Sequence, residues 1–445
     1  MEKIIETPCG KIKGYNCRIP GVTAFKGIRF AVAERWKYPE EITGWEGIYD
    51  ASSYGNCCFQ PRSFYNEEEN LKKVFYYNEF RKGETYNYSE DCLFLNIWAP
   101  DDADEKSRLP VLVYIHGGGY KGGCGHEKPF DDPIWPKKGV VAVTINYRLG
   151  PFGFACLPEL EKEAGHCGNY GLYDQLTALK WINHNISAFG GNPEQVTIMG
   201  QSAGAMSVQH LCQNSLAKGF FHGAVMSSGG GAGHILTGKA EKNFGFWSEV
   251  MKLCGCKNLD EFRKVPAEKL FENWQKAQKE VKGGTMAATP VKDNIFITEK
   301  PEPLDIHYMM GSTSHDMMAP ILYSMAKKWG IKNNLKNYVW FFERMLPGDK
   351  NGAWHSSDLW YWFGTLPNCW RPMEKEDYVL SEKMSEYLCN FVKNGNPNGG
   401  NLPEWKPCTK DNKKVLKLGK EKTGMGKANI AKLFYTMLTT KSVGE

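Results

Sequence analysis

Short runs of consecutive apolar residues recur along the chain, with segments of a different periodicity between them. A continuous apolar run of roughly four to eight residues is typical of a strand buried on both faces of a sheet, and such sheets are mostly parallel. The pattern therefore predicts strands at residues 111–115, 140–145, 196–199, 223–226, 307–310 and 338–342.

Between two of these runs, the apolar positions recur at steps of three and four, which is the spacing of one helical stripe. We expect the chain to break at Asn192 and Pro193, before the next strand. Alternation of strands and helices predicts an α/β fold, with a large, mostly parallel central sheet and helices on both faces. The residues of the helical stripe are Leu172, Leu176, Leu179, Ile182 and Ile186.

Residues 1–105 have a different pattern, with many glycines and aromatic residues and short alternating segments. We interpret this region as antiparallel strands and loops attached to the same sheet. No internal repeat, low-complexity tract or long linker divides the sequence, so it predicts one domain over residues 1–445.

The composition is that of an ordinary globular protein, with 42% apolar and 24% charged residues. It excludes a disordered or a collagen-like chain. The formal net charge of +5 is too weak over this length to indicate binding to nucleic acid. Since no apolar run approaches the roughly 18 residues of a membrane span, and no signal peptide is visible, we expect a cytoplasmic protein without a membrane partner.

Cysteine spacing is more informative than the cysteine count of 14. The sequence contains no Cys-x-x-Cys pair, and no two of its ten histidines lie three or four residues apart. A zinc site built from neighbouring ligands is therefore not expected, and we predict neither a metal nor a cofactor. In a cytoplasmic chain, we expect the thiols to be mostly reduced and packed as small apolar side chains.

The strongest chemical signal is the sequence Gly-Gln-Ser-Ala-Gly at residues 200–204. It follows the predicted strand at 196–199 directly and precedes a segment that could be helical, residues 205–212. A tight strand–helix turn of this kind requires small neighbours around the serine, whose hydroxyl then projects above the sheet as a nucleophile. Ser202 is therefore the candidate nucleophile, and the alternative is a merely structural glycine turn.

A second signal, His-Gly-Gly-Gly at residues 116–119, follows another predicted strand. Consecutive glycines expose backbone N–H groups that can stabilise the oxyanion formed during acyl transfer. Gly117, Gly119 and Gly122 also match the dinucleotide-binding pattern, but that motif requires a helix after its last glycine. The sequence that follows, Gly-Cys-Gly-His-Glu-Lys-Pro, is a poor start for a helix, so we favour the oxyanion interpretation over a nucleotide site or a structural loop.

The general base should be a histidine after Ser202, because hydrolases with this turn place their residues in the chain order serine, acid, histidine. His355 lies in a loop after the predicted strand at 338–342, where such a fold presents its base. The other candidates lie within predicted strands or helices or in other loops. They are His210, His222, His234, His307 and His315.

These motifs, taken together, resemble the type-B carboxylesterase family, which includes the cholinesterases and many bacterial esterases and has the α/β-hydrolase fold. The resemblance extends through most of the chain and is more specific than any single motif. The segments that carry it are Phe-Lys-Gly-Ile-Arg-Phe-Ala (25–31), Ser-Glu-Asp-Cys-Leu-Phe-Leu-Asn-Ile-Trp (89–98), the glycines at 116–119, Asn-Tyr-Arg-Leu-Gly (146–150) and the stretch from 168 to 204.

The resemblance implies that Ser202 is the acyl-enzyme nucleophile and His355 the base. It implies an oxyanion hole formed by the N–H groups of Gly118, Gly119 and Ala203. Ser228 matches a buried serine near the triad, although ordinary hydrogen bonding at a strand end explains it equally well.

Several features depart from the family pattern. The interval from Asp316 to His355 is shorter than in larger members, which implies a bacterial-type esterase with a small helical cap at residues 235–300 and 317–337. Gln201 stands where cholinesterases have an acidic residue, which argues against a site adapted to a choline head group. Cys58 and Cys92 match a pair that is disulfide-bonded in secreted relatives. In a cytoplasmic chain we expect neighbouring thiols, and a disulfide in the crystallised protein is the alternative.

Two carboxylates in the sequence are candidates for the triad acid. Asp316 follows the predicted strand at 307–310, where relatives place Gly-x-x-x-Asp-Glu-Gly with glutamate as the acid. Asp358 lies only three residues from His355, and the matching carboxylate in the family is a structural neighbour. We favour Asp316 because of its position at a strand end.

The sequence therefore predicts a serine hydrolase of carboxylic esters that acts through an acyl-enzyme intermediate. Trp354, beside the proposed base, is expected to line the acyl or alcohol pocket, which favours small or aryl esters as substrates. An amide, carbamate or thioester substrate remains open, and so does a non-catalytic binding protein on the same scaffold, although such members typically lack a complete nucleophile and base.

Overall fold

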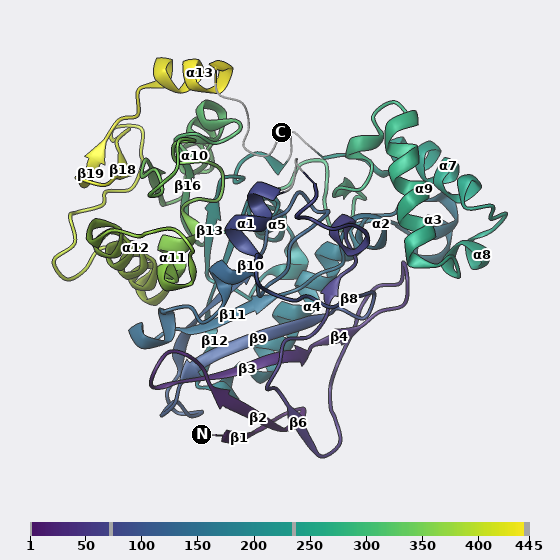
Figure 1. Ribbon diagram of the computed structural model, residues 1–445, viewed down its shortest axis with the longest axis horizontal. Helices are drawn as coiled ribbons and strands as arrows, with labels where there is room; N and C mark the ends of the chain where they lie inside the picture. Colours follow the sequence, from purple (N-terminus) through teal and green to yellow (C-terminus); the bar gives the residue numbers. More distant parts are fainter. Residues whose placement is uncertain (1, 71–73, 234–236, 440–445) are drawn as a thin grey trace.

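A large twisted sheet forms the centre of the computed structural model, which describes residues 2–70, 74–233 and 237–439 (Figure 1). Its strands follow the order β1-β2-β3-β9-β11-β10-β12-β13-β16-β17-β18-β19, and β6 pairs with β2. The strand bounds are β1 (Glu2–Thr7), β2 (Gly10–Asn16), β3 (Val22–Arg29), β6 (Ile48–Asp50), β9 (Phe94–Pro100), β10 (Leu109–Ile115), β11 (Val141–Ile145), β12 (Gly191–Gln201), β13 (Gly223–Ser227), β16 (His307–Thr313), β17 (Asn337–Phe342), β18 (Val415–Leu418) and β19 (Thr423–Gly426).

All neighbouring strands from β11 to β18 pair in parallel, and antiparallel strands extend the sheet at both ends. The predicted break before β12 was wrong. The strand already begins at Gly191, which pairs with Leu109, and the register then shifts before Val111 pairs with Val196. Asn192 and Pro193 fall in this irregular stretch, where a proline removes no regular ladder hydrogen bond.

Alternate side chains of the central strands enter two separate cores, one on each face of the sheet. In β10, Val111, Val113 and Ile115 belong to one core, whereas Leu112 and Tyr114 belong to the other. Since both faces of the sheet are buried, the sequences of its central strands are continuous apolar runs. The first core also receives side chains from α4 and α5, and the second receives them from α11 and α12.

Helices surround the sheet and form two lobes at its sides in Figure 1, one of them containing α7, α8 and α9. α10 packs against β16 and β17. That residues 235–300 and 317–337 act as a cap stays a prediction. The helix bounds are α1 (Val74–Phe80), α2 (Gly150–Gly153), α3 (Pro158–Ala164), α4 (Tyr170–Asn185), α5 (Ala203–Cys212), α7 (Phe244–Leu253), α8 (Leu259–Arg263), α9 (Ala267–Glu280), α10 (Ala319–Asn333), α11 (Leu359–Phe363), α12 (Lys375–Asn394) and α13 (Ile430–Thr439).

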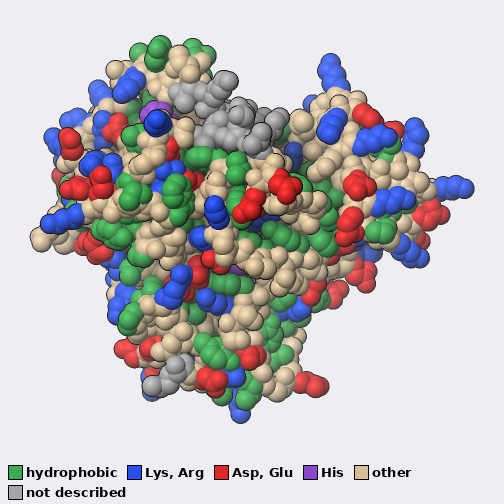
Figure 2. Space-filling view, viewed as in Figure 1, with side chains coloured by type: hydrophobic (Ala, Val, Ile, Leu, Met, Phe, Trp, Pro, Cys, Tyr) green, Lys and Arg blue, Asp and Glu red, His purple; other side chains and the backbone are tan. Residues whose placement is uncertain are grey.

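Three small two-stranded pairings lie outside the main sheet. They are β4 (Ala31–Val32) with β5 (Glu40–Glu41), β7 (Cys57–Cys58) with β8 (Tyr88–Ser89), and β14 (Gly238–Lys239) with β15 (Val291–Lys292). On the face shown in Figure 2, basic and acidic side chains are interspersed over both lobes, in keeping with the weak net charge. Across the ranges that the structure describes, each helix is too short or too polar to cross a membrane.

Candidate active site

Ser202 lies in a tight turn between the end of β12 and the start of α5. Its backbone has φ 58° and ψ −125°, a conformation that a residue with a side chain rarely adopts. A Cβ atom at Gly200 would overlap the carbonyl oxygen of Gly204, and one at Gly204 would overlap that of Ile115. The turn therefore requires glycine at both positions, which explains the spacing of the sequence motif.

The glycine loop after β10, residues 116–123, packs directly against this turn. A Cβ at Gly117 would lie 3.0 Å from the Cβ of Ser202, so the two segments are in close contact. Gly118 and Gly119 have φ values of 107° and 65°, and a Cβ at Gly118 would overlap the carbonyl oxygen of Gly122. Only glycine fits this path of the backbone, and it leaves the N–H groups free of covering side chains.

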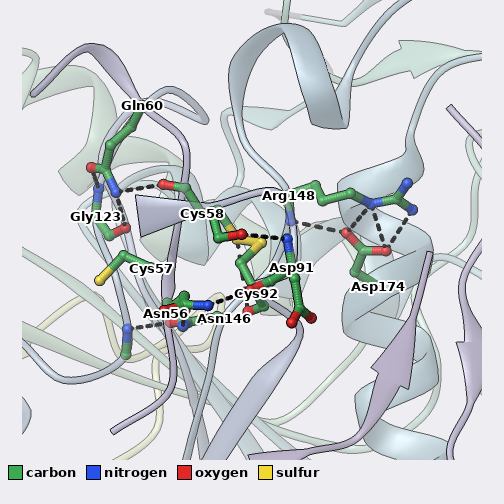
Figure 3. The surroundings of a disulfide bond; sticks show 12 residues. Asn56, Cys57, Cys58, Gln60, Asp91, Cys92, Gly123, Asn146, Arg148 and Asp174 are labelled. Carbon is green, nitrogen blue, oxygen red and sulfur yellow. Dashed lines mark hydrogen bonds and ion pairs between the residues drawn. A yellow bond between two sulfur atoms is a disulfide. The ribbon is translucent and has the colours of Figure 1, made fainter. Parts of the chain in front are cut away.

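Contacts from distant segments hold both ends of the glycine loop. At its start, the Tyr147 hydroxyl donates a hydrogen bond of 2.9 Å to the carbonyl oxygen of His116. At its end, the Gln60 side chain makes two hydrogen bonds with the backbone of Gly123, of 2.9 and 3.1 Å (Figure 3). Loop geometry is thus fixed by tertiary contacts, which local sequence reasoning did not identify.

His355 and Asp316 lie together, although 39 residues separate them. Nδ1 of His355 lies 2.8 Å from Oδ1 of Asp316, and both side chains are largely buried. The carboxylate also accepts a 3.0 Å hydrogen bond from the backbone N–H of Met317 and a 3.3 Å one from the Thr313 hydroxyl. An N–H at Nδ1 that points to a carboxylate leaves Nε2 as the basic nitrogen.

The electrostatic effects of this pair oppose those of burial. Burial alone would raise the pKa of Asp316, but the charge and hydrogen bond of His355 outweigh it and leave the pKa lowered. Burial alone would lower the pKa of His355, and the Asp316 carboxylate reverses this and raises it. The arrangement therefore favours a charged carboxylate and stabilises an imidazolium once one forms.

The Asp358 carboxylate is bonded to partners other than His355. Its Oδ2 accepts hydrogen bonds of 2.9 Å from the Ser227 hydroxyl and 3.0 Å from Trp362 Nε1. Burial raises the pKa of Asp358 to about 6, because these two neutral donors only partly offset the loss of hydration. The structure thus brings Asp316, and not Asp358, to the Nδ1 of His355.

The Gln201 side chain lies beside the proposed base, His355. The sequence did not predict this contact. Its Nε2 lies 3.1 Å from Nε2 of His355, the nitrogen opposite Asp316. With the Nδ1 proton directed at Asp316, the Gln201 amide donates to the Nε2 lone pair. The only sequence signal for this contact was that Gln201 directly precedes Ser202. The direction of its side chain depends on how the turn folds.

The other candidate histidines in the described part of the chain take other positions, although His315 directly precedes Asp316 and pairs with Trp354. His210 is buried in α5, His307 begins β16, and His315 Nδ1 lies 3.0 Å from the Ser314 hydroxyl. His222 is exposed just before β13, and His234 lies outside the described residues.

Two further predicted site residues, Trp354 and Ser228, occupy buried positions. Trp354 is fully buried beside Phe75, and its Nε1 donates a 2.7 Å hydrogen bond to Asp349. This environment favours a role in the core, and pocket lining by Trp354 stays a prediction. Ser228 follows β13 with φ 55°, and its backbone N–H donates a 2.8 Å hydrogen bond to the carbonyl oxygen of Gly311.

Cys58 and Cys92 form a disulfide bond, with their sulfur atoms 2.15 Å apart (Figure 3). Of the two alternatives that the sequence left open at these positions, the structure has the disulfide and not the pair of reduced thiols. Disulfides persist mainly in oxidising compartments, so this bond lends no support to the cytoplasmic location predicted from the sequence. The cross-link joins β7 to the segment just before β9, close to Gln60, which holds the glycine loop.

Comparison with known proteins gives a consistent result over the whole chain. Residues 1–338 and 322–434 match the Carboxylesterase family. A para-nitrobenzyl esterase of Bacillus subtilis (strain 168) is 42% identical over a region covering 51% of this chain and 44% of the relative. Carboxylesterase 5A of Mus musculus is 28% identical over 93% of this chain and 85% of its own length.

Solved structures resemble the fold over nearly its full length. A thermophilic PNB esterase gives a TM-score of 0.81 at 25% identity and covers 98% of this chain and 100% of its own. An esterase from the anaerobe Clostridium hathewayi that can hydrolyse aliphatic aromatic polyesters gives a TM-score of 0.83 at 25% identity, with 99% and 98% covered. These similarities identify the architecture as an α/β-hydrolase fold.

Proposed function

The chain belongs to the carboxylesterase family and is a carboxylesterase, and we propose that it hydrolyses esters through Ser202, His355 and Asp316. The observation that carries this proposal is the 2.8 Å contact between His355 Nδ1 and Asp316 Oδ1. Ser202 also lies in a strained turn of the kind that exposes a nucleophile at the carboxyl end of a strand in a parallel sheet.

In the proposed reaction, Nε2 of His355 takes the proton of the Ser202 hydroxyl as the serine oxygen attacks the ester carbonyl. To do so, the base must exchange its contact with the Gln201 amide for one with Ser202. Asp316 holds the imidazole in the required tautomer and stabilises the imidazolium. The alcohol then leaves with the proton from His355, and water hydrolyses the acyl-enzyme by the same route.

The oxyanion of each tetrahedral intermediate is assigned to the N–H groups of Gly118, Gly119 and Ala203. Support comes from the glycine conformations and from the close approach of Gly117 to Ser202. Ala203 is the first residue of α5, where the helix leaves its N–H groups without intrahelical partners. Donors that are already in place need no reorganisation as charge develops, which is the main source of such stabilisation.

Small or aryl esters are the proposed substrates, and the partner is a small molecule. The prediction that Trp354 lines the pocket led to this assignment, and the names of two relatives agree with it. One relative is a para-nitrobenzyl esterase, and another is described as hydrolysing aliphatic aromatic polyesters.

A panel of nitrophenyl esters of increasing acyl length, with matched anilides and thioesters, tests the proposal. We expect the fastest turnover for short acyl esters, loss of turnover in Ser202→Ala, and no loss in Ser215→Ala, which changes an exposed serine. A fluorophosphonate probe should label Ser202, as located by peptide mass. Turnover that survives in Ser202→Ala would contradict Ser202 as the nucleophile. No turnover of any ester would contradict the proposed hydrolysis and favour a binding protein.

A further inference from the structure

Three metal-binding side chains meet in the interior between β7 and the loop that follows β10. They are Cys57, Cys124 and His126, and the ligand atoms that they offer all lie within 4.8 Å of one another. Both cysteines are completely buried and lack a disulfide partner, and His126 is 9% exposed. The cluster is separate from Ser202, His355 and Asp316, and the proposed ester hydrolysis does not use it.

We propose that Cys57, Cys124 and His126 bind one zinc ion. Zinc takes thiolate and imidazole ligands in a tetrahedral arrangement, and typical bond lengths place a sulfur and a nitrogen ligand about 3.6 Å apart. The Sγ of Cys57 lies 3.5 Å from Nε2 of His126. The two atoms are thus already at the separation that a shared zinc ion requires.

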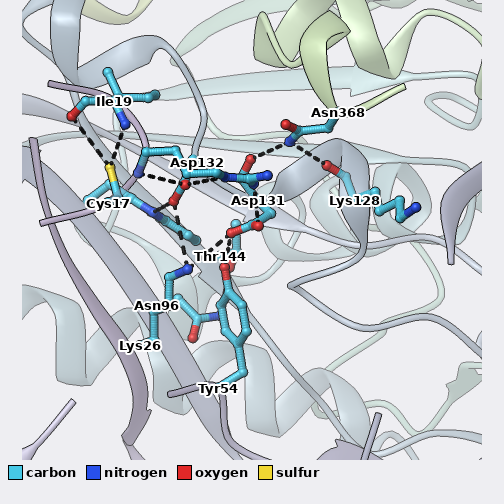
Figure 4. A network of polar contacts seen from close by, with 12 residues as sticks. Cys17, Ile19, Lys26, Tyr54, Asn96, Lys128, Asp131, Asp132, Thr144 and Asn368 are labelled. Carbon is cyan, nitrogen blue, oxygen red and sulfur yellow. Dashed lines mark hydrogen bonds and ion pairs between the residues drawn. The ribbon is translucent and has the colours of Figure 1, made fainter. Parts of the chain in front are cut away.

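The imidazole of His126 is held in place before any metal binds. The ring of Tyr54 stacks on it, with the centroids 4.4 Å apart and the planes 8° from parallel. The Tyr54 hydroxyl in turn donates to Asp131, within a polar network that includes Lys26 (Figure 4). Fixed ring orientation is a property of metal-binding histidines, since neighbouring groups set the direction of the ligand nitrogen.

The charges around the cluster are compatible with this ligand set. Both thiols release a proton to solvent as their sulfur–zinc bonds form, so two thiolates balance the double charge of the ion. Nη2 of Arg62 lies 4.0 Å from the Cys124 sulfur, where it can stabilise a thiolate. Arg62 and Arg81 both bind the Glu127 carboxylate, and Arg81 also binds Glu67, so two carboxylates balance the two guanidinium charges beside the cluster.

The site would join two segments that already support the glycine loop. Cys124 directly follows Gly123, whose backbone is held by Gln60, three residues after Cys57. Figure 3 shows the Cys57 thiol pointing away from the Cys58–Cys92 disulfide and toward the side of Gly123. Sequence spacing did not predict the site, because its ligands come from positions 57 and 124–126 and meet only in the folded chain.

Cobalt substitution tests the proposal on the full chain with the Cys58–Cys92 disulfide intact, as verified by mass. Chelator-treated protein is incubated with Co²⁺, and the thiolate-to-cobalt charge-transfer absorption is recorded. The zinc content of the untreated protein is measured separately by elemental analysis. We expect one ion per chain, and a loss of at least tenfold in band intensity in Cys57→Ser and Cys124→Ser. Cys389→Ser, which changes a buried free cysteine in α12, should keep the full band.

Circular dichroism shows whether each variant is folded. If a variant is unfolded, the cobalt titration of the wild-type protein still tests the proposal. The proposal is overturned if wild-type protein with the Cys58–Cys92 disulfide intact takes up no cobalt, or if the band persists in Cys57→Ser or Cys124→Ser. A mass and peptide map that join Cys57 to Cys124 in the isolated protein would also overturn it, in favour of a second disulfide.

Discussion

Replacement of Asp316 by asparagine removes the carboxylate that is hydrogen-bonded to Nδ1 of the proposed base. The substitution keeps the size of the side chain, and the pocket formed by Thr313 and the Met317 N–H can still hold it. It replaces a charged acceptor, 2.8 Å from His355 Nδ1, by a neutral amide. The imidazole then loses both the preference for the Nδ1–H tautomer and the stabilisation of its charged form.

The expected loss follows from the roles of that contact. In other serine hydrolases with a buried triad acid, the same change lowers kcat by about 10⁴, or roughly 5 kcal/mol of transition-state stabilisation. The pH profile should change as well. The base acts in its neutral form, so activity falls as the pH decreases through the pKa of His355. Since Asp316 raises that pKa against the effect of burial, the acidic limb should move to lower pH in Asp316→Asn.

The assay is steady-state hydrolysis of a short-chain nitrophenyl ester as a function of pH, with thermal unfolding as the test of folding. Asp358→Asn is the matched comparison, because Asp358 is a buried carboxylate three residues from His355 that binds Ser227 and Trp362 instead. Near-normal turnover in Asp316→Asn together with a large loss in Asp358→Asn would refute the assignment. An unshifted acidic limb in Asp316→Asn would refute the electrostatic argument.

Three other predictions concern the loop, the disulfide and the second buried carboxylate. Gly118→Ala should lower kcat by on the order of 10² in the same assay, because its Cβ would overlap the Gly122 carbonyl oxygen and displace a proposed oxyanion donor, whereas Gly219→Ala, with a similar φ but open space around it, should not. Joint replacement of Cys58 and Cys92 by alanine should cost up to about 4 kcal/mol in denaturant unfolding, because the cross-link closes a 34-residue separation. Burial raises the pKa of Asp358 from 3.8 to about 6, so its contribution to stability is present at low pH and is lost as the pH rises through that value. The two-unit shift corresponds to roughly 3 kcal/mol, and Asp358→Asn should remove this pH dependence from the free energy of unfolding, measured between about pH 4 and pH 8.

The central sheet could be predicted from the sequence because its strands are buried on both faces and read as continuous apolar runs. The run at 111–115 lies within β10, and the run at 307–310 lies within β16. The boundaries were less accurate, as β12 shows. Asn192 and Pro193 looked like a break, but the strand continues through an irregular stretch that needs no regular ladder bonds.

The parts of the candidate site that could be predicted are those set by local backbone geometry or by chain order. The glycines around Ser202 are required by the turn itself, and Asp316 was favoured because it follows a strand. Contacts between distant side chains could not be predicted in this way. The approach of Gln201 to His355 depends on how the turn faces a loop far along the chain, and the Cys58–Cys92 bond depends on β7 lying beside the segment before β9.

The contacts around the glycine loop connect the N-terminal part of the chain to the proposed chemistry. Glycines at positive φ give the loop its path next to the Ser202 turn, but a glycine-rich loop on its own samples many conformations. An oxyanion site is effective only if its donors are held in position before the reaction. Tyr147 holds one end of this loop and Gln60 the other, and Gln60 lies two residues after the disulfide at Cys58. Residues outside the proposed triad thus hold the proposed oxyanion donors in position, so Gln60→Ala should lower kcat more than it raises KM for the same ester.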